Sequence, residues 1–137
     1  MAIGDLFNDG KLEAVVENLK GQPMILRLES GSENYWISFQ LEGEKSNRLA
    51  LNALVRATAG SLVQLGGVIR ASYLSQNDPR IHFGLGDYQR VDKADILWPD
   101  GKLEILTNLA ADCFYLVREG AGEVSSGSPG AGQANRP

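Results

Sequence analysis

Three carboxylates near the N-terminus have the spacing of ligands for a hard cation. Asp5, Asp9 and Glu13 occupy positions 1, 5 and 9 of a loop, and Gly10 at position 6 permits a tight turn. The backbone carbonyl of Lys11 falls at position 7. Oxygen ligands in this pattern favour calcium, which takes about six to eight of them. We therefore expect a weakly bound calcium ion at Asp5, Asp9, Lys11 and Glu13.

The same loop departs from a complete calcium site at two positions. Phe7 stands at position 3, where a ligand is expected, and Val16 stands at position 12, where an EF-hand requires an acid. The apolar residues Ala14 and Val15 predict that a strand follows the loop, whereas an EF-hand continues as a helix. An EF-hand is therefore not expected, and a turn that binds no metal is the alternative interpretation.

The single histidine, His82, could be assembled on paper into a triad with Ser72 or Ser75 and with Asp78 or Asp87. No nucleophile-elbow motif accompanies these residues. Because a triad is defined by geometry, the sequence favours a hydrogen-bonded structural histidine. The polar residues just before it are turn formers, and binding of a sugar is the less favoured alternative for them.

The other chemistry-bearing residues give weaker signals. Gly84 and Gly86 lack the third glycine and the helix of a dinucleotide-binding loop. Asp92 and Asp95 could be imagined as a glycosidase pair, but they flank a hairpin strand and are expected to be solvated. Cys113 alternates within an apolar strand, which is typical of a buried free thiol. We expect no enzyme activity from these residues.

Composition excludes several classes of protein. The 137 residues carry 13 Lys and Arg against 17 Asp and Glu, a net charge of −4 that argues against nucleic-acid binding. One His and one Cys exclude an internal disulfide and any metal site with two imidazoles. No secretory signal is visible at the start, and no apolar run reaches the roughly 18 residues of a membrane span. A small, soluble, mildly acidic domain is expected.

The elements that position these residues are predicted to be β-strands. Residues 35–41 alternate with a period of two, and residues 113–118 form a further apolar run. Pro99-Asp100-Gly101 is a strong turn signal and predicts a hairpin over 93–107. We expect an all-β fold, an antiparallel β-sandwich over residues 34–119. Its core is expected to contain either Trp36 or its alternating partners Tyr35, Ile37 and Phe39. Beside them we expect Phe83, Ile96, Trp98, Leu103, Phe114 and Leu116.

The two ends of the chain differ from this middle part. Residues 12–28 predict a β-hairpin with strands at 15–19 and 24–28. Residues 120–137 are mainly Gly, Ser, Ala and Pro with a single Val as the only large apolar residue, and we expect a disordered tail.

Several stretches resemble the ASPIC/UnbV domain: SYLSQNDPRIHFGLG (72–86), VDKADILWPDG (91–101), LTNL (106–109), KSNR (45–48) and Trp36. The resemblance covers residues 34–119. Ahead of it, residues 4–16 look like the last FG-GAP (VCBS-type) repeat of a β-propeller. In that family the repeat loop holds calcium and the ASPIC/UnbV domain follows the propeller. The parent proteins, which include cartilage acidic protein-like proteins, look secreted or envelope-associated.

The resemblance implies three parts. Residues 1–30 would be a partial FG-GAP/VCBS-type repeat, the fragment of a last propeller blade, followed by the ASPIC/UnbV sandwich at 34–119 and the tail at 120–137. The chain would then be a C-terminal piece of a longer protein. Two departures from the family pattern are Phe7, in place of an Asn or Asp ligand, and residues 49–53, in place of a Gly-containing segment.

The function that the resemblance implies is non-catalytic. The domain would be an extracellular-type binding or structural module that caps or extends a calcium-binding propeller and interacts with protein or glycan. Its expected contact residues are the aromatic side chains Tyr73, Tyr88 or Tyr115. The alternatives are an enzyme or biosynthetic accessory with a hydrolase-like site near Ser72 and His82, and a structural remnant that binds nothing.

Overall fold

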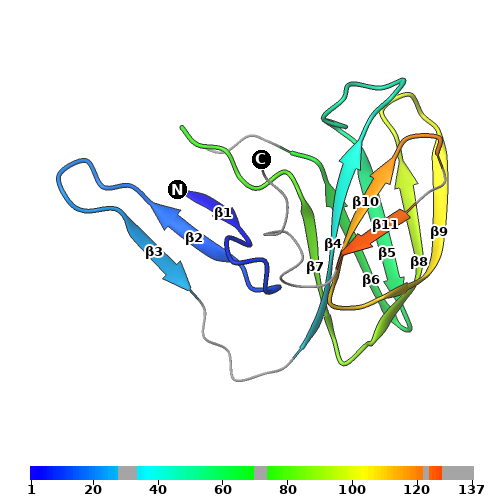
Figure 1. The fold of residues 1–137 in the computed structure, drawn as a ribbon, viewed down its shortest axis with the longest axis horizontal. Coiled ribbons are helices and arrows are strands. Elements are labelled where there is room, and N and C mark those ends of the chain that lie inside the picture. Colours follow the sequence, from blue (N-terminus) through cyan, green and yellow to red (C-terminus); the bar gives the residue numbers. More distant parts are fainter. Residues whose placement is uncertain (28–33, 70–73, 122–123, 128–137) are drawn as a thin grey trace.

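The regular elements in the described residues are β-strands, and the clearest alternation of apolar and polar residues, at 35–41, leads to one of them. The structure is a computed structural model that describes residues 1–27, 34–69, 74–121 and 124–127. In these ranges it has eleven strands in three sheets and no helix, so the predicted all-β fold is confirmed (Figure 1). Within the same ranges, nothing could cross a membrane as an apolar helix.

The first sheet is small and lies at the N-terminus. Its order is β1 (Ala2–Gly4), β2 (Glu13–Val16) and β3 (Met24–Arg27), with both pairs antiparallel. The predicted hairpin over residues 12–28 is therefore confirmed. The two strands pair in a different register from the one that strands at 15–19 and 24–28 would give. Strand β2 ends at Val16, and Glu13 lies opposite Arg27.

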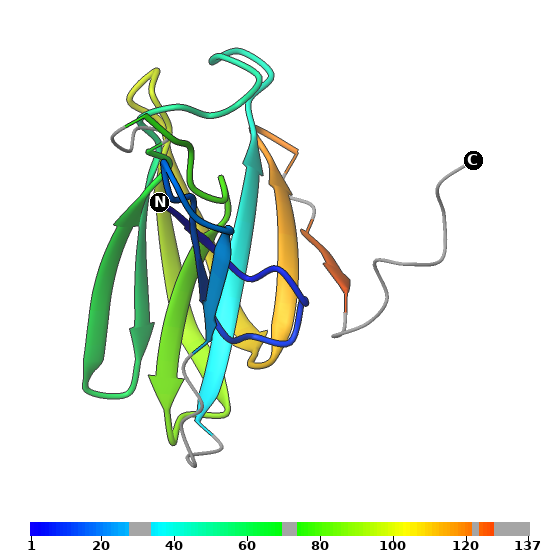
Figure 2. The same ribbon diagram turned by 90° about the vertical axis from the view of Figure 1, so that its left-hand side faces the viewer.

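The other strands form two four-stranded sheets that pack face to face (Figure 2). The β4 sheet has the order β11 (Val124–Gly127), β10 (Cys113–Arg118), β4 (Tyr35–Glu42) and β7 (Ile81–Gly86). The β8 sheet has the order β6 (Leu62–Gly67), β5 (Leu54–Ala59), β8 (Arg90–Leu97) and β9 (Leu103–Ala110). The predicted sandwich is confirmed. Its one parallel pair is β4 with β10, which makes the β4 sheet mixed.

The inner faces of these two sheets form the core. Buried aromatic and aliphatic side chains fill it, including five that the alternation predicts: Ile37, Phe39, Phe83, Ile96 and Trp98. The expectation for Leu103 was wrong, since its side chain is 58% exposed on the outer face of β9. On β10 the core side chains are Tyr115 and Val117, whereas Phe114 and Leu116 lie on the opposite face.

The hairpin between β8 and β9 follows the predicted turn. Gly101 has φ of +88°, a conformation that glycine adopts without a steric penalty. The Trp98 N–H donates to the Lys102 carbonyl at 2.8 Å and closes the turn. Asp100 accepts a hydrogen bond from the Lys102 N–H at 3.0 Å, which is the role expected of an aspartate in a turn.

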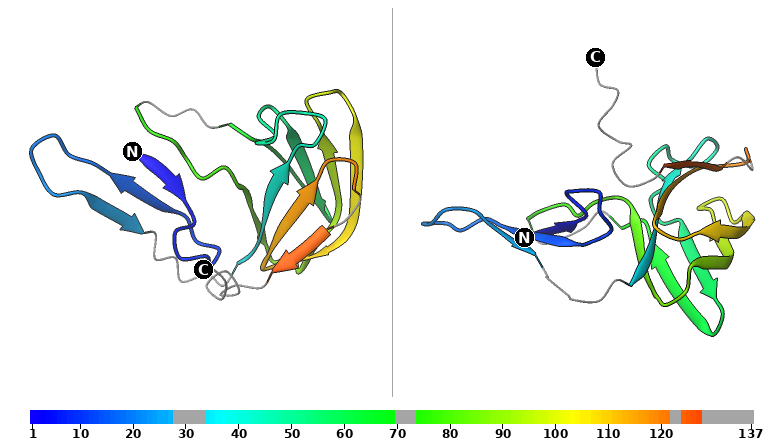
Figure 3. Two further views of the ribbon diagram at one scale, coloured as in Figure 1. Left: turned by 45° about the horizontal axis from the view of Figure 1, so that its top comes forward. Right: turned by 60° about the horizontal axis from the view of Figure 1, so that its bottom comes forward.

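Part of the Gly- and Ser-rich tail is a strand. Val124–Gly127 form β11, which pairs antiparallel with β10, and Figure 3 shows it along that edge of the β4 sheet. The structure differs here from the expected disorder, because the free edge of β10 offers backbone partners to a segment with few apolar side chains. Residues 122–123 and 128–137 lie outside the described residues.

Candidate functional site

The N-terminal segment packs on the outer face of the β4 sheet. Gly10 lies against the Trp36 indole so closely that a methyl group at Gly10 would come within 2.0 Å of Trp36 Nε1. Trp36 is 7% exposed although it points away from the core. Its ring stacks on His82 at 5.6 Å and contacts Phe114 at 4.8 Å between centroids. The N-terminal loop therefore covers an aromatic cluster of the sandwich.

Backbone hydrogen bonds join the small sheet to the segment before β7. The Asp78 N–H donates to the Ile3 carbonyl at 2.9 Å, and the Ile3 N–H donates to Asn77 Oδ1 at 3.0 Å. The Ser75 hydroxyl donates to the Met1 carbonyl. The edge strand β1 thus has partners on both sides, in β2 and in this segment.

Arg80 is the main polar contact between the two parts. Its guanidinium bonds both Asp78 oxygens, with Nε at 2.9 and 3.0 Å. It also donates to Asn8 Oδ1 at 2.6 Å and to the Asp5 carbonyl at 2.7 Å, and it lies 4.9 Å from the centre of the Phe114 ring. A guanidinium suits this position because it presents several donors in a fixed geometry. Arg80 therefore has a structural role in the interface.

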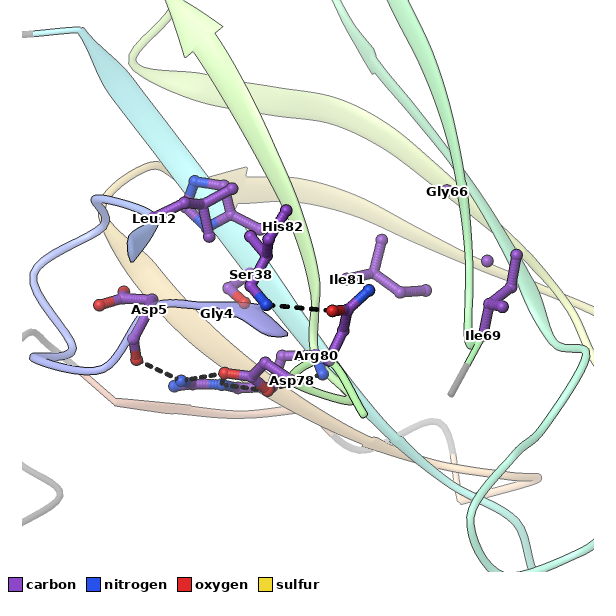
Figure 4. A pocket seen from close by; sticks show the side chains of 13 residues that line it. Gly4, Asp5, Leu12, Ser38, Gly66, Ile69, Asp78, Arg80, Ile81 and His82 are labelled. Carbon is purple, nitrogen blue, oxygen red and sulfur yellow. Dashed lines mark hydrogen bonds and ion pairs between the residues drawn. The ribbon is translucent and has the colours of Figure 1, made fainter. Parts of the chain in front are cut away.

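A cavity of about 320 Å³ lies beside this contact, between the N-terminal segment and the ends of β6 and β7. Figure 4 shows Asp5, Ser38, Asp78, Arg80 and His82 around it, with Arg80 and Asp78 side by side. Arg80 and Asp78 bind each other, and Asp5 binds its own loop. The cavity has room for a small polar molecule, but most of its polar lining already has partners within the protein.

His82 lies in this cavity without the partners of a triad. Its Nδ1 atom is buried and has no hydrogen-bond partner among the described residues, so the expected hydrogen-bonded histidine was wrong at this atom. Burial lowers the pKa of His82, with smaller opposing contributions from Asp5 and Asp78. The Ser75 hydroxyl bonds the Met1 carbonyl instead. Ser72, the other candidate nucleophile, lies outside the described residues.

The carboxylates of the predicted calcium loop bind the loop itself. Asp5 accepts hydrogen bonds from the backbone N–H groups of Asp9 at 3.1 Å and Gly10 at 2.8 Å. Glu13, which is 1% exposed, accepts one from the Leu6 N–H at 3.0 Å. Asp9 accepts one from the Lys11 N–H at 3.2 Å. The spacing therefore brings these side chains together, with Asp5 and Asp9 in the loop and Glu13 at the start of β2, and there they hold the turn.

Arg27 occupies the position of a cation in this loop. The register of β2 and β3 places it opposite Glu13, and its Nε lies 3.5 Å from Glu13 Oε1. Its guanidinium also forms an ion pair with Asp9 and lies 5.2 Å from the centre of the Phe7 ring. Phe7 stands at the position where the loop pattern calls for a ligand, and its ring thus stacks on the guanidinium of Arg27.

The loop as placed does not fit a calcium ion. In the described residues no three His, Cys, Asp or Glu side chains are grouped to hold a metal. Asp9 and Glu13 would have to release Arg27, and Asp5 would have to release two N–H groups. Calcium binding at Asp5, Asp9, Lys11 and Glu13 stays a prediction.

A buried carboxylate that the sequence did not indicate organises the loop after β4. Glu119 is 5% exposed, and its Oε2 accepts the backbone N–H groups of Glu44, Lys45 and Ser46 at 2.7 to 2.9 Å. These bonds hold the pKa of Glu119 below its usual range, with the Ser46 N–H making the largest contribution. The partners lie more than 70 positions apart, so no local motif marks them.

The outer face of the β8 sheet carries exposed aliphatic side chains around an ion pair. Arg56 Nε lies 3.0 Å from Asp95 Oδ2, and Lys93 Nζ lies 2.7 Å from Asp95 Oδ1. Asp95 is 6% exposed, so the expectation of a solvated residue was wrong. We call this surface the aliphatic face; its aliphatic members, each between 38% and 69% exposed, are Leu54, Val63, Leu65, Leu97, Leu103 and Ile105.

The aromatic side chains proposed as contact residues do not form one patch. Tyr115 is 6% exposed and its hydroxyl donates to the Ala110 carbonyl, so the expectation of an exposed ring was wrong. Tyr88 is 37% exposed and its hydroxyl lies 3.0 Å from Ser61 Oγ. Tyr73 lies outside the described residues.

Comparison with known proteins identifies the sandwich. The ASPIC and UnbV family matches residues 43–124, which is more than half of the 137 residues. The match contains β5 to β10 and the loop that Glu119 organises. No curated protein matches the chain. The extent of the family match shows that this chain belongs to the ASPIC and UnbV family.

Proposed function

We propose that this chain is a non-catalytic binding and structural module that follows a β-propeller and mediates interaction with protein. The observation that carries the proposal is one face of the small N-terminal sheet. The registers place Ile3, Ala14 and Leu26 in one cross-strand row of that face, next to the pair Val16 and Met24. Ile3, Met24 and Leu26 are 40%, 45% and 53% exposed.

Such a face needs a covering layer. A sheet of two or three short strands is marginally stable unless its apolar face packs on another element. In Figures 1 and 3 this sheet extends away from the sandwich. The neighbouring blade of a propeller presents a sheet of the same kind and would cover it. This geometry supports a role for the small sheet as the end of a propeller.

Protein is favoured over glycan as the further partner. Sugar-binding surfaces commonly use exposed aromatic rings, and most described aromatic rings here are buried or half-buried. The larger exposed apolar surface is the aliphatic face, which suits contact with another protein. An extracellular setting and the calcium of the propeller belong to this proposal.

The first test concerns the propeller. The reading frame directly upstream should encode FG-GAP repeats, and that propeller should co-elute with this chain when the two are co-expressed. Leu26→Asp should weaken co-elution at least tenfold, because it places a charge on the covered face. Leu49→Asp is the matched control, since Leu49 is 45% exposed in the loop between β4 and β5. An upstream frame without repeats, or equal loss in both variants, would contradict the proposal.

The second test concerns catalysis. The rival function is a hydrolase that uses the cavity with His82, whose unpartnered Nδ1 is the observation in its favour. A panel of ester, amide and glycoside substrates should give no turnover with the 137-residue chain. Turnover that is lost in His82→Ala would overturn the non-catalytic proposal.

A further inference from the structure

The aliphatic face is built from cross-strand rows with a regular chemistry. The central row runs across β6, β5, β8 and β9 as Leu65, Arg56, Asp95 and Ile105. Read along the sheet, this row is apolar, positive, negative and apolar. The order of charges reverses when the row is read from the other end, while the apolar ends stay the same.

The neighbouring row has the same symmetry without the charges. It contains Leu54 on β5 and Leu97 on β8 as a central pair, with Gly67 and Leu103 at its ends. Leu54 and Leu97 are 38% and 41% exposed. The third row, toward the other end of the strands, is Val63, Thr58, Lys93 and Thr107.

A two-fold axis parallel to the strands, placed above the line between β5 and β8, makes this face complementary to itself. The operation exchanges β5 with β8 and β6 with β9. It therefore sets Arg56 opposite Asp95 of a second copy, and Leu65 opposite Ile105 of that copy. Isologous interfaces of this kind need a surface that complements its own rotated copy.

We propose that two copies of this chain pack face to face through the aliphatic face. The interface contains two Arg56–Asp95 pairs at its centre, each Asp95 also held by its own Lys93. The leucines Leu54 and Leu97 of each copy lie opposite one another beside those pairs. This inference rests on the part of the proposed function that gives the aliphatic face to contact with protein, and it names that protein as a second copy of the chain. The proposed contact with the propeller uses the small N-terminal sheet instead, so the two tests can fail separately.

The size of the face sets the strength of the dimer. Four strands at about 4.8 Å spacing and about five residues along each strand span an area on the order of 300 Å² in projection. Stable interfaces bury about 800 Å² on each partner. The face is therefore smaller than a standard interface, and we expect the dimer to be weak and reversible.

Sedimentation equilibrium of the 137-residue chain, from about 10 µM to about 1 mM, tests this interface. The chain should pass reversibly from monomer to dimer across this range. Leu97→Asp should weaken association on the order of tenfold or more, because it buries an unpaired carboxylate against an apolar surface. Leu49→Asp is the matched control, since Leu49 is 45% exposed in the loop between β4 and β5, outside the aliphatic face, and its variant should associate as the original chain does.

A charge exchange tests the register of the two copies. Arg56→Asp alone sets like charges together within and between copies and should leave a monomer. The double variant Arg56→Asp/Asp95→Arg restores the Arg–Asp contacts within and between copies but sets Lys93 beside a like charge, so it should restore the dimer in part. A chain that stays monomeric at 1 mM, a Leu97→Asp variant that dimerises unchanged, or loss of dimer in Leu49→Asp would overturn the proposal. If Leu97→Asp fails to fold, Ile105→Lys at the exposed edge replaces it. Unchanged dimerisation of Ile105→Lys would likewise overturn the proposal.

Discussion

Both outer faces of the sandwich carry large apolar side chains, but the two faces differ in what covers them. On the β4 sheet the outward Trp36 is 7% exposed, because the N-terminal loop lies on it. On the β8 sheet the outward Leu97 and Leu103 are 41% and 58% exposed. In the described residues, the outer face of the β4 sheet is covered by the chain's own N-terminal loop. The outer face of the β8 sheet is available to another molecule.

The difference shows what an alternating pattern can specify. A period of two determines which residues share a face of a strand. It does not determine whether a distant segment covers that face. Trp36 is covered by the loop of Gly10, and Arg80 holds that loop through Asn8 and the Asp5 carbonyl, although residues 10, 36 and 80 lie far apart in the sequence. The predictions below separate the two faces, beginning with the largest expected effect.

Gly10→Ala should open the covered face. The added methyl group would lie about 2 Å from the indole of Trp36, and residue 10 has φ of +83°, which an alanine adopts only with strain. We expect a loss of about 3 kcal/mol in the free energy of unfolding, from the clash together with the strain. Urea denaturation followed by tryptophan fluorescence measures it.

Gly101→Ala is the matched control for this substitution. Gly101 has a similar φ of +88°, but no atom lies within 4 Å of an added methyl group. It should cost only the backbone strain, about 1 kcal/mol. Equal losses in the two variants would show that the contact with Trp36 adds nothing to stability.

Arg80→Gln should weaken the same face by a smaller amount. It removes the charged donors to Asp78, Asn8 and the Asp5 carbonyl and leaves a carboxylate without its partner. We expect a loss of about 2 kcal/mol in the free energy of unfolding. Arg90→Gln is the control, since its ion pair with Asp92 is exposed and should contribute under about 0.5 kcal/mol. A cost for Arg80→Gln as small as that of the control would contradict the role of Arg80.

The sequence predicted the strands well where the pattern was local. The alternation at residues 35–41 and the turn Pro99-Asp100-Gly101 lead directly to β4 and to the β8–β9 hairpin. It did not specify the parallel pairing of β4 with β10, because no local signal encodes it. Four consecutive large apolar residues, 114–117, also leave the inward face of β10 undecided, and tertiary contacts select Tyr115 and Val117.

The sequence predicted which carboxylates gather at the candidate loop, but it did not predict what they bind. Asp5 and Asp9 lie in the loop, and Glu13 begins β2 directly after it. Arg27 was missed because strands at 15–19 and 24–28 would place it opposite Val16, whereas the actual register places it opposite Glu13. A shift in strand register thus brought a guanidinium to the carboxylates.

Calcium and Arg27 should therefore compete in this loop. Arg27→Gln should lower the melting temperature without calcium and recover part of the loss in millimolar calcium, because Asp9 and Glu13 then lack their cation. The original chain should gain less from calcium than this variant does, and Phe7→Asp/Arg27→Gln should gain more. Differential scanning calorimetry measures these shifts of a few degrees. An equal gain in the original chain would show that Arg27 does not take the place of a cation.

The smallest expected effect is a difference between the two faces in how the stability of the chain depends on pH. Burial holds the pKa of His82 below its ordinary 6.5, so the unfolded chain takes up its proton first and stability falls as pH drops below 6.5. On the other face, hydrogen bonds from Lys93 and then Arg56 lower the pKa of Asp95, so its contribution is lost only below its ordinary 3.8. His82→Phe keeps an aromatic ring on Trp36 and should flatten the melting temperature between pH 7 and 5. Asp95→Asn should leave that slope unchanged, and a slope that persists in His82→Phe would assign it to another group.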